Sequence, residues 1–502
     1  MATDHTRSHS FIKSILLVLT SFFFLPLSFS VLVASYASQC LLSQPQLRLK
    51  IRASPRFRAK TILISGIGTP QGLRIARAFY ETGHEVIGTD FEPENVYLHA
   101  RYSRSLRKFY RLRPYNPLYG TALYLRDLLN VADKENVDLY INCSSLINPS
   151  ECAEISSAME TKSSCKTLSL DTELINSFSS RDKSLNYIKS LGLPVPELHQ
   201  VRSRADVHKI LHESQGKKKY TLNAPAVNGI VARNPKTMLP RRTLSQTYND
   251  LSRIRISKEE QWTMEQYFAI GEDYTTFAII VSGELKAFAA AQLAKNSTAY
   301  HSIRSDKGIG KAMLNFVRTF GQKAGKDFST NLSMSFKIDE KNTESGIEWT
   351  VLPTDCKVNV SPPILLFAST SGSAALVRAY LTILAPTTNG LSTFTGVESL
   401  PDSMDHVIAP EAGPGTYFVG EDLLELVLRP IAQMLALKMN VMQLAWNFLT
   451  LFEHMLFWRD GIYESWDPLP AFLLYHVYMP VRLGLHFLKR HDSEDLDVGL
   501  ME

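Results

Sequence analysis

Three glycines that follow a short apolar run form a turn of the kind that brings a backbone close to a phosphate. The turn reads Gly66-Ile-Gly68-Thr-Pro-Gln-Gly72, and Asp90 lies where an acidic side chain would bind the ribose of a dinucleotide. Its spacing, GxGxxxG, departs from the GxGxxG fingerprint, and no Tyr-x-x-x-Lys pair follows in the same region. The pattern therefore permits two interpretations, a nicotinamide site or a turn that serves only the fold.

The elements that would hold this turn are a strand, a helix and a second strand. Residues 61–65, Thr-Ile-Leu-Ile-Ser, predict a buried parallel strand. Residues 73–80 have a helical pattern that Gly83 ends, and residues 84–90 predict the next strand. A further strand is predicted over residues 138–142. We therefore expect a Rossmann-like domain over residues 59–175.

Length and composition limit the classes of protein to consider. The chain has 502 residues, more than one hydrophobic core organises, so two or three domains are expected. The net charge of +5 is small for this length, and nucleic acid is not an expected partner. Five scattered cysteines without a CxxC pair argue against a disulfide framework or a zinc site.

An uncharged apolar segment lies near the N-terminus. Ile15–Tyr36 is long enough to cross a bilayer as a helix, whereas a signal peptide cut after Ala34-Ser-Tyr-Ala37 is the alternative. Pro26 would either kink this helix or turn it into a hairpin within one leaflet. A basic run follows, which predicts an anchor with the folded body on the cytosolic side. The run consists of Arg48, Lys50, Arg52, Arg56, Arg58 and Lys60.

The middle of the chain carries a family resemblance. A helix begins at Arg181-Asp-Lys183 and ends at Gly192-Leu-Pro-Val-Pro196, and four strands are predicted after it. These strands cover residues 219–223, 262–267, 277–281 and 284–288. This order resembles the α/β ATP-grasp fold of carboxylate–amine ligases. The segment Trp466-Asp-Pro-Leu-Pro-Ala-Phe-Leu-Leu-Tyr-His476 is similar to a signature of the ligases that join glycine to 4-deoxygadusol in mycosporine biosynthesis, and of related secondary-metabolism enzymes.

The resemblance implies an acyl-phosphate mechanism that uses ATP and Mg²⁺ as cofactors. Lysines and metal ions would meet the charge on the phosphates. Lys183 matches the family's first phosphate-binding lysine, and Asn223 stands where the second is expected. Lys217, Lys218 and Lys219, just upstream, are candidate substitutes for that second lysine.

The metal positions implied by the resemblance depart further from the family. Lys337 replaces an acidic ligand, and Asp339, two residues on, is a register-shifted candidate. In the segment Asp355-Cys-Lys357-Val-Asn359, a lysine replaces the amide ligand and Asn359 replaces an arginine. The expected metal ligands are therefore Asp339, Asp355 and Asn359. Lys357 is expected to take the cation's place and contact phosphate, which makes Lys183 and Lys357 the catalytic candidates.

The adenine-binding strand of the family is matched more closely. It corresponds here to Met264-Glu265-Gln266-Tyr267, with the two polar residues exchanged. The resemblance implies that Glu265, Gln266 and Tyr267 border the adenine through their backbone. Glu272 or Asp273 would bind the ribose hydroxyls.

The C-terminal part is predicted to be helical and apolar. One helix is expected over residues 421–457, interrupted near Pro430, and a second apolar stretch over residues 471–488. Two arrangements fit, an interfacial helix pair on a bilayer and a buried hairpin. The predicted units are an anchor and linker (1–58), the Rossmann-like domain (59–175), an ATP-grasp domain (176–400), a helical region (401–490) and an acidic tail (491–502).

Three functions remain open. The first is an ATP-dependent ligase of secondary metabolism, with a small-molecule carboxylate and an amine as substrates and other pathway enzymes as possible partners. The second is a membrane scaffold in which the same fold has lost its activity, because several charged positions are altered together. The third is a nicotinamide-dependent oxidoreductase built on the turn at residues 66–72.

Overall fold

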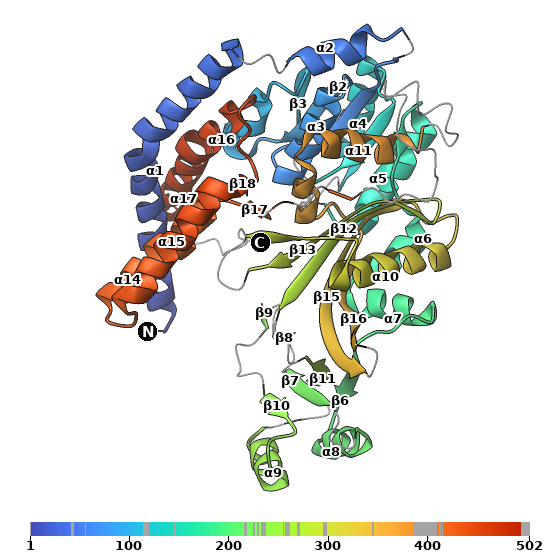
Figure 1. Ribbon diagram of the computed structural model, residues 1–502, viewed down its shortest axis with the longest axis vertical. Coiled ribbons are helices and arrows are strands. Elements are labelled where there is room, and N and C mark those ends of the chain that lie inside the picture. The colour runs from blue at the N-terminus through green and yellow to red at the C-terminus, as the bar shows by residue number, and fades with distance from the viewer. Residues whose placement is uncertain are drawn as a thin grey trace.

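The computed structural model is a mixed α/β protein with a parallel sheet, a small antiparallel sheet and a larger mixed sheet (Figure 1). A layer of apolar helices from both ends of the chain flanks the sheets. The structure describes residues 2–41, 45–55, 57–113, 120–144, 147–214, 218–223, 226–227, 230–231, 237–254, 256, 262–268, 272–294, 299–343, 346–384, 409–410, 413 and 415–492.

The parallel sheet confirms the predicted Rossmann-like arrangement. Its order is β3-β2-β1-β4-β5, with all neighbours parallel. The strands are β1 (Thr61–Ser65), β2 (Glu85–Phe91), β3 (Lys108–Leu112), β4 (Leu139–Asn142) and β5 (Lys166–Thr167). The helices around it are α3 (Pro70–Glu81), α4 (Ala122–Glu135) and α5 (Pro149–Lys162).

The start of α3 shows why the turn is rich in glycine. Thr69 caps the helix, since its Oγ1 accepts a hydrogen bond from the Gly72 amide at 3.0 Å, and Pro70 occupies the first turn. A Cβ on Gly72 would lie 2.5 Å from the Gly66 carbonyl oxygen. Only glycine permits this approach, so the glycines serve the packing of the turn.

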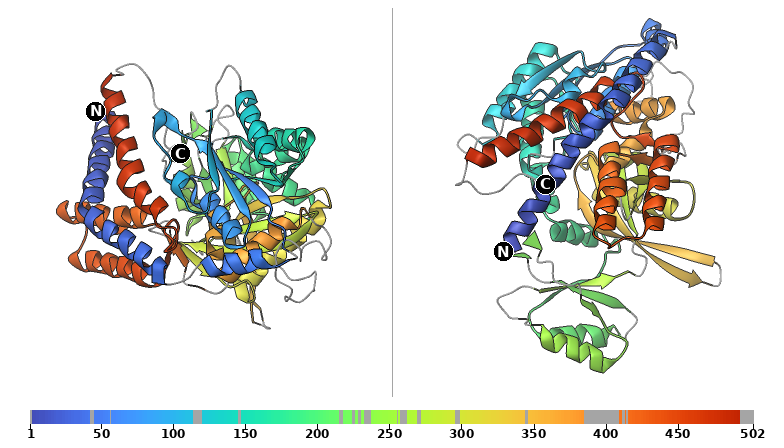
Figure 2. Two further views of the ribbon diagram at one scale, coloured as in Figure 1. Left: turned by 90° about the horizontal axis from the view of Figure 1, so that it is seen from above. Right: turned by 90° about the vertical axis from the view of Figure 1, so that its left-hand side faces the viewer.

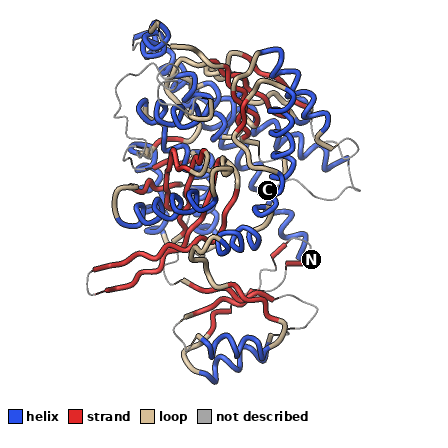
Figure 3. Tube along the Cα trace, turned by 90° about the vertical axis from the view of Figure 1, so that its right-hand side faces the viewer, coloured by secondary structure: helices blue, strands red, loops and turns tan. Residues whose placement is uncertain are grey.

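The small sheet forms a lobe with its own core (Figure 3). Its order is β10-β7-β11-β6, with antiparallel neighbours. The strands are β6 (Leu198–Val201), β7 (Lys219–Asn223), β10 (Thr237–Leu239) and β11 (Trp262–Tyr267), and the short pair β8 (Ala226–Val227) and β9 (Ile230–Val231) lies apart. Helices α8 (Arg204–Glu213) and α9 (Leu244–Arg253) cover one face.

The largest sheet has the order β16-β15-β12-β13-β14-β17-β18. Its strands are β12 (Asp273–Val281), β13 (Glu284–Leu293), β14 (Tyr300–Ile303), β15 (Thr330–Thr343), β16 (Gly346–Lys357), β17 (Gly415–Tyr417) and β18 (Arg459–Asp460). Beyond the end of β12, β15 and β16 continue as a two-stranded ribbon that projects from the body (Figures 2 and 3). The helices beside this sheet are α6 (Thr172–Ile175), α7 (Arg181–Ser190), α10 (Gly308–Ala324) and α11 (Thr370–Leu381).

One hydrophobic core joins the parallel sheet to the largest sheet. It contains Ile62 of β1, Phe277 of β12 and Tyr380 of α11, all fully buried. A second core, with Phe320 of α10 and Phe336 of β15, covers the opposite face of the largest sheet. The parallel and largest sheets therefore form one packed body, from which the small lobe extends.

Helices from both termini pack together on one side of this body (Figure 2). They are α1 (Ala2–Leu41), α13 (Val419–Asp422), α14 (Arg429–Leu435), α15 (Val441–Phe457), α16 (Leu469–Leu473) and α17 (Met479–Asp492). Helix α2 (Pro45–Ala53) contacts α3 instead. In α1, Val18–Ser38 is long and apolar enough to cross a membrane, and 11% of it is buried. Length and composition alone do not separate an anchor from a signal sequence.

Contacts between α1 and the C-terminal region follow one stripe of the helix. Ser21 Oγ donates to the Tyr475 carbonyl at 2.8 Å, and Ser35 Oγ lies 2.7 Å from the Tyr463 hydroxyl. Between them, the ring of Phe29 lies 6.4 Å from that of Phe472. Positions 21, 29 and 35 recur about every two helical turns, so α1 lies along the body by a single face.

Two predictions about prolines are corrected by the helices themselves. α1 runs unbroken through Pro26, so the hairpin interpretation is wrong. The break in the C-terminal helices lies at residues 436–440, after Leu435, and not at Pro430. Pro430 falls in the first turn of α14, next to a π-helical segment, Leu423–Leu428, whose wider turns accommodate the change in hydrogen bonding.

The buried imidazole of His84 gives the first domain a pH-dependent stability. Burial lowers the pKa of His84 to about 3, and its Nδ1 accepts a hydrogen bond from the Lys60 amide at 3.1 Å. Between pH ~6.5 and ~3, His84 is therefore protonated in the unfolded chain but neutral in the folded chain. The free energy of unfolding falls as the pH is lowered through this window. In the wild type, His84 should lower the free energy of unfolding by about 1.4 kcal/mol for each pH unit below ~6.5, and His84→Gln should abolish this contribution.

The measurement is urea unfolding of the full chain in detergent at several pH values below neutrality. His212→Gln is the control, because His212 lies exposed in the last turn of α8. The same slope in the wild type and in His84→Gln would contradict the prediction.

Candidate functional site

The N-terminus of α7 places the first predicted phosphate lysine. Ser180 caps this helix, with its side chain accepting from the Lys183 amide. Lys183 Nζ lies 3.1 Å from Ser179 Oγ and is exposed to solvent. A helix N-terminus with an adjacent lysine offers amide donors and a positive charge to an anion.

Arg181, to which the sequence assigned no role, connects α7 to two sheets. Its Nε donates to the Thr354 carbonyl of β16 at 2.6 Å, and its Nη2 forms an ion pair with Glu265 of β11. Burial acts to lower the pKa of Arg181, but the hydrogen bond and charge of Glu265 and the charge of Asp355 outweigh it and raise the pKa. The predicted adenine strand, the phosphate helix and the predicted metal strand therefore meet at Arg181.

The predicted adenine strand lies inside the small sheet, between β7 and β6. The Gln266 amide donates to the Glu197 carbonyl at 3.0 Å, and the Thr221 hydroxyl donates to the Glu265 carbonyl at 3.3 Å. Tyr267 ends the strand opposite Lys219 of β7. Part of the backbone expected to border adenine is thus already bonded within the sheet.

Asn223 has no nearby lysine to replace it on β7. It pairs with Thr263, whereas Lys219 pairs with Tyr267 at the other end of the strand. Four residues of strand separate them by about 13 Å. Lys218 is bound to Glu197 by an ion pair. Lys219 therefore lies at the far end of β7 from Asn223, and Lys218 is paired with Glu197; Lys217 lies outside the described residues.

The predicted ribose-binding acids are engaged by side chains of the protein. Asp273 Oδ1 lies 2.6 Å from Lys337 Nζ, in an ion pair between β12 and β15. Glu272 Oε2 accepts a hydrogen bond from the Tyr274 hydroxyl at 2.7 Å. Lys337, which stands where the family has an acidic metal ligand, therefore neutralises one of these acids.

The predicted metal ligands lie at or near the β15–β16 pair. Asp355 Oδ2 forms an ion pair with Lys357 Nζ at 3.0 Å, and Asp355 Oδ1 accepts from the Cys356 amide at 2.9 Å. Asn359 lies exposed just past the end of β16. Asp339 pairs with Thr350 in the ribbon, and its side chain lies outside the described part of the structure.

The donor set described here does not fit a magnesium ion. Mg²⁺ prefers several oxygen ligands, usually carboxylates and phosphates. Among the side chains that the structure describes, no three or more His, Cys, Asp and Glu residues are grouped closely enough to hold a metal. Asp355, the carboxylate retained from the family pattern, is already paired with a lysine.

Side chains of the protein itself, from Asp90 and Leu98, contact the glycine turn at residues 66–72. The Gly68 amide donates to Asp90 Oδ2 at 2.7 Å, and a Cβ on Gly68 would lie 2.9 Å from the Leu98 side chain. Burial raises the pKa of Asp90 to about 6. The acid that would bind a ribose is used inside the turn, which favours the interpretation that the turn serves the fold.

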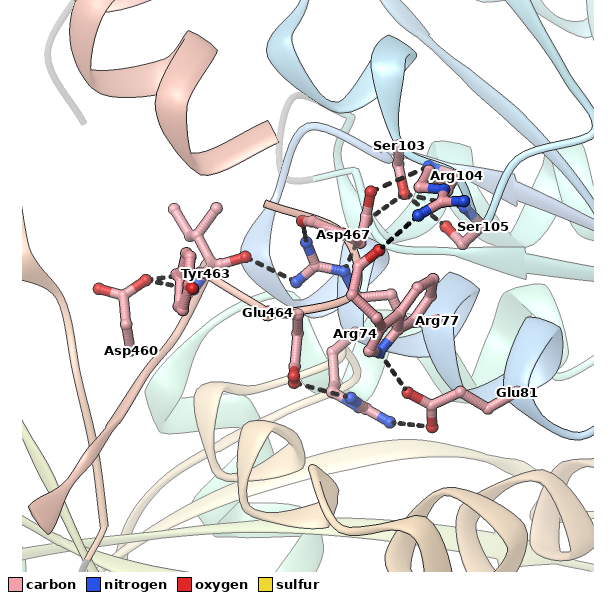
Figure 4. A network of polar contacts seen from close by, with 12 residues as sticks. Arg74, Arg77, Glu81, Ser103, Arg104, Ser105, Asp460, Tyr463, Glu464 and Asp467 are labelled. Atoms are coloured by element: carbon pink, nitrogen blue, oxygen red, sulfur yellow. Dashed lines mark hydrogen bonds and ion pairs between the residues drawn. The ribbon is translucent and has the colours of Figure 1, made fainter. Parts of the chain in front are cut away.

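The C-terminal signature forms a buried polar junction with the first domain (Figure 4). Asp467 is fully buried and accepts from Arg77 Nε at 2.9 Å, from Ser103 Oγ at 2.6 Å and from the Arg104 amide at 2.9 Å. Arg77 in turn donates to the Ile462 carbonyl at 2.6 Å. The signature is therefore a structural clamp between chain segments about 390 residues apart.

Further polar and aromatic contacts surround the Arg77–Asp467 pair. Arg74 of α3 contacts Glu464 and Glu81, and the Trp466 indole donates to Glu81 at 3.1 Å (Figure 4). The Trp466 ring stacks on Tyr80, with centroids 5.4 Å apart. These contacts hold the C-terminal region on α3.

Comparison with known proteins gives a likeness of overall structure only. No family model matches the chain, and no curated protein matches it. Similar solved structures include the biotin carboxylase subunit of pyruvate carboxylase (14% identity, 66% of this chain, 70% of the other, TM-score 0.46). They also include N5-carboxyaminoimidazole synthetase from Staphylococcus aureus with ADP (13%, 76%, 87%, 0.44) and an L-amino acid ligase from Bacillus licheniformis (13%, 69%, 78%, 0.39). Likeness at this level carries no functional argument, which has to come from the residues.

Proposed function

We propose that the protein is an ATP-grasp-type ligase that joins a small-molecule carboxylate to an amine in secondary metabolism, with ATP as the activating substrate. The observation behind this proposal is the junction at Arg181, two residues before Lys183 in α7, which pairs with Glu265 of β11 and donates to the Thr354 carbonyl of β16, the residue before the Asp355–Lys357 pair. These residues come from three separate elements, and the family pattern assigns the same elements to phosphate, adenine and metal.

In this proposal, lysine side chains supply the positive charge that metal ions supply in the family. Lys183 would hold the phosphates together with the α7 amides, and Lys357 would supply positive charge where the family has a metal ligand. Exposed lysine–aspartate pairs are weak, at about 0.2–1 kcal/mol, so a phosphate can readily draw Lys357 from Asp355.

A membrane scaffold without activity is the second candidate. It is favoured by the pairing of acids with cations throughout the site: Glu265 with Arg181, Asp273 with Lys337, and Asp355 with Lys357. A site whose charges satisfy one another needs no ligand to complete it. α1 would hold either protein at a membrane, with the body cytosolic.

Calorimetric titration of the full chain with ATP separates the two candidates. The ligase predicts binding that Lys183→Ala weakens about tenfold or more, since a charged hydrogen bond contributes about 1.5–3 kcal/mol. Lys189→Ala is the matched control, because Lys189 lies exposed at the other end of the same helix. Absence of nucleotide binding, with and without magnesium, would exclude the ligase and leave the scaffold.

A further inference from the structure

Helix α15 carries its large apolar side chains on the outside. Trp446 is 71% exposed, Phe457 69% and Phe452 64%. Six more apolar residues of α15 are exposed in the same way: Val441, Met442, Phe448, Leu449, Met455 and Leu456. Large side chains of this type are normally buried, and a continuous exposed set marks an interaction surface.

The inner face of α15 is polar where it meets the body. His454 Nδ1 lies 2.5 Å from Asp422 Oδ2 of α13, and both side chains are buried. The His454 ring also packs on Trp458, with centroids 4.3 Å apart. The His454–Asp422 contact and Leu451 therefore face the protein, while nine large apolar side chains of α15 are exposed. An ordinary surface helix turns its apolar stripe toward the core instead. Of the two apolar stretches expected to form a buried hairpin, α15 is therefore exposed, whereas Ala471 and Leu474 of the second stretch are buried.

Charged residues border the helix at both ends. The preceding turn places Leu437, 94% exposed, next to an exposed Lys438, and an exposed Arg459 follows the helix. The helix has 17 residues and is about 25 Å long, short of the roughly 20 residues that span a bilayer. Basic residues at both ends of a short apolar helix suit the anionic headgroup region of a membrane.

Helix α15 lies on the same side of the molecule as α1 and α17 (Figure 2, right). On α1, Phe22, Phe23 and Leu27 are more than half exposed. A bilayer that covers this side of the molecule would therefore contact exposed apolar residues of both α1 and α15. Continuity with α1 and the flanking cations both point to lipid as the occupant.

We infer that α15 is a second membrane-binding element, an interfacial helix whose outer face enters a phospholipid leaflet beside α1. α1 tethers the chain, and α15 fixes the orientation of the body against the membrane. This inference does not depend on the ligase activity, because none of its residues belongs to the groups around Lys183.

Trp446 reports directly on this contact. The full chain is reconstituted into vesicles of phosphatidylcholine and phosphatidylglycerol whose acyl chains carry bromine, a contact quencher of indole fluorescence. Trp262 and Trp458 are 8% exposed, and Trp349 and Trp466 are half-buried. We expect bromine to quench the wild type about twofold more than Trp446→Phe, with the strongest quenching from bromine placed near the headgroups.

Trp349→Phe is the matched control, because Trp349 lies on the β15–β16 ribbon, and it should be quenched like the wild type. Both substitutions keep an aromatic ring, and unchanged thermal unfolding confirms that the variants fold. Equal quenching of the wild type and Trp446→Phe in vesicles that retain the protein would overturn the inference. Cross-linking of α15 to a second copy under those conditions would then identify the copy as its partner.

Discussion

Replacing Asp467 by alanine is expected to lower the free energy of unfolding by about 3–5 kcal/mol, because it leaves the guanidinium of Arg77 buried without its partner. The Arg77 side chain is 2% exposed and that of Asp467 is 0% exposed. The substitution also removes the acceptor for Ser103 Oγ and the Arg104 amide. Urea unfolding of the full chain in detergent measures the loss.

A matched exposed pair provides the control. Arg304 and Asp306 form an ion pair at 2.7 Å with side chains 62% and 52% exposed. Asp306→Ala should change the free energy of unfolding by about 1 kcal/mol or less, since exposed ion pairs contribute little. Similar losses in the two variants would show that the Asp467 junction is not the clamp inferred from its burial.

The second large effect is expected at Lys357. If this lysine supplies charge to phosphate, Lys357→Asn should weaken ATP binding in the absence of magnesium by about 10- to 100-fold, the size of a charged hydrogen bond. The substitution restores the amide that the family has at this position and frees Asp355 from its ion pair. Added magnesium is therefore expected to recover more affinity in the variant than in the wild type, as measured by calorimetry.

Lys286→Asn tests whether the effect is specific to this position. Lys286 pairs with Glu284 two residues away on β13, the same spacing and chemistry as Lys357 with Asp355 on β16. It should leave ATP affinity unchanged. Loss of affinity in both lysine variants, or in neither, would contradict the role proposed for Lys357.

Local patterns predicted most elements of the fold. The glycine turn, the alternation of β12 and the Gly-Leu-Pro-Val-Pro stop after α7 are read from neighbours in sequence, and each falls where it was expected. The positions of α1 and α15 relative to the body could not be obtained in this way. They depend on pairs such as Ser35 with Tyr463 and His454 with Asp422, which no periodicity reveals.

The candidate site was predictable in its residue types but not in its internal pairing. Lys357 and Asp355 share a strand two residues apart, so their contact follows from strand geometry. Arg181 has no such local signal, because Glu265 is 84 residues away and Thr354 is 173 residues away. Whether charges at a site meet one another or await a ligand is decided by tertiary structure.

The stripe of contacts along α1 can form only late in the synthesis of the chain. Ser21 leaves the ribosome early, whereas its partners Tyr475 and His476 are made more than 450 residues later. Throughout that interval, the side of α1 that docks on the body lacks its protein partners. A chain truncated before residue 463 would lack all of these partners, and ribosome-stalled chains of increasing length should show when docking occurs.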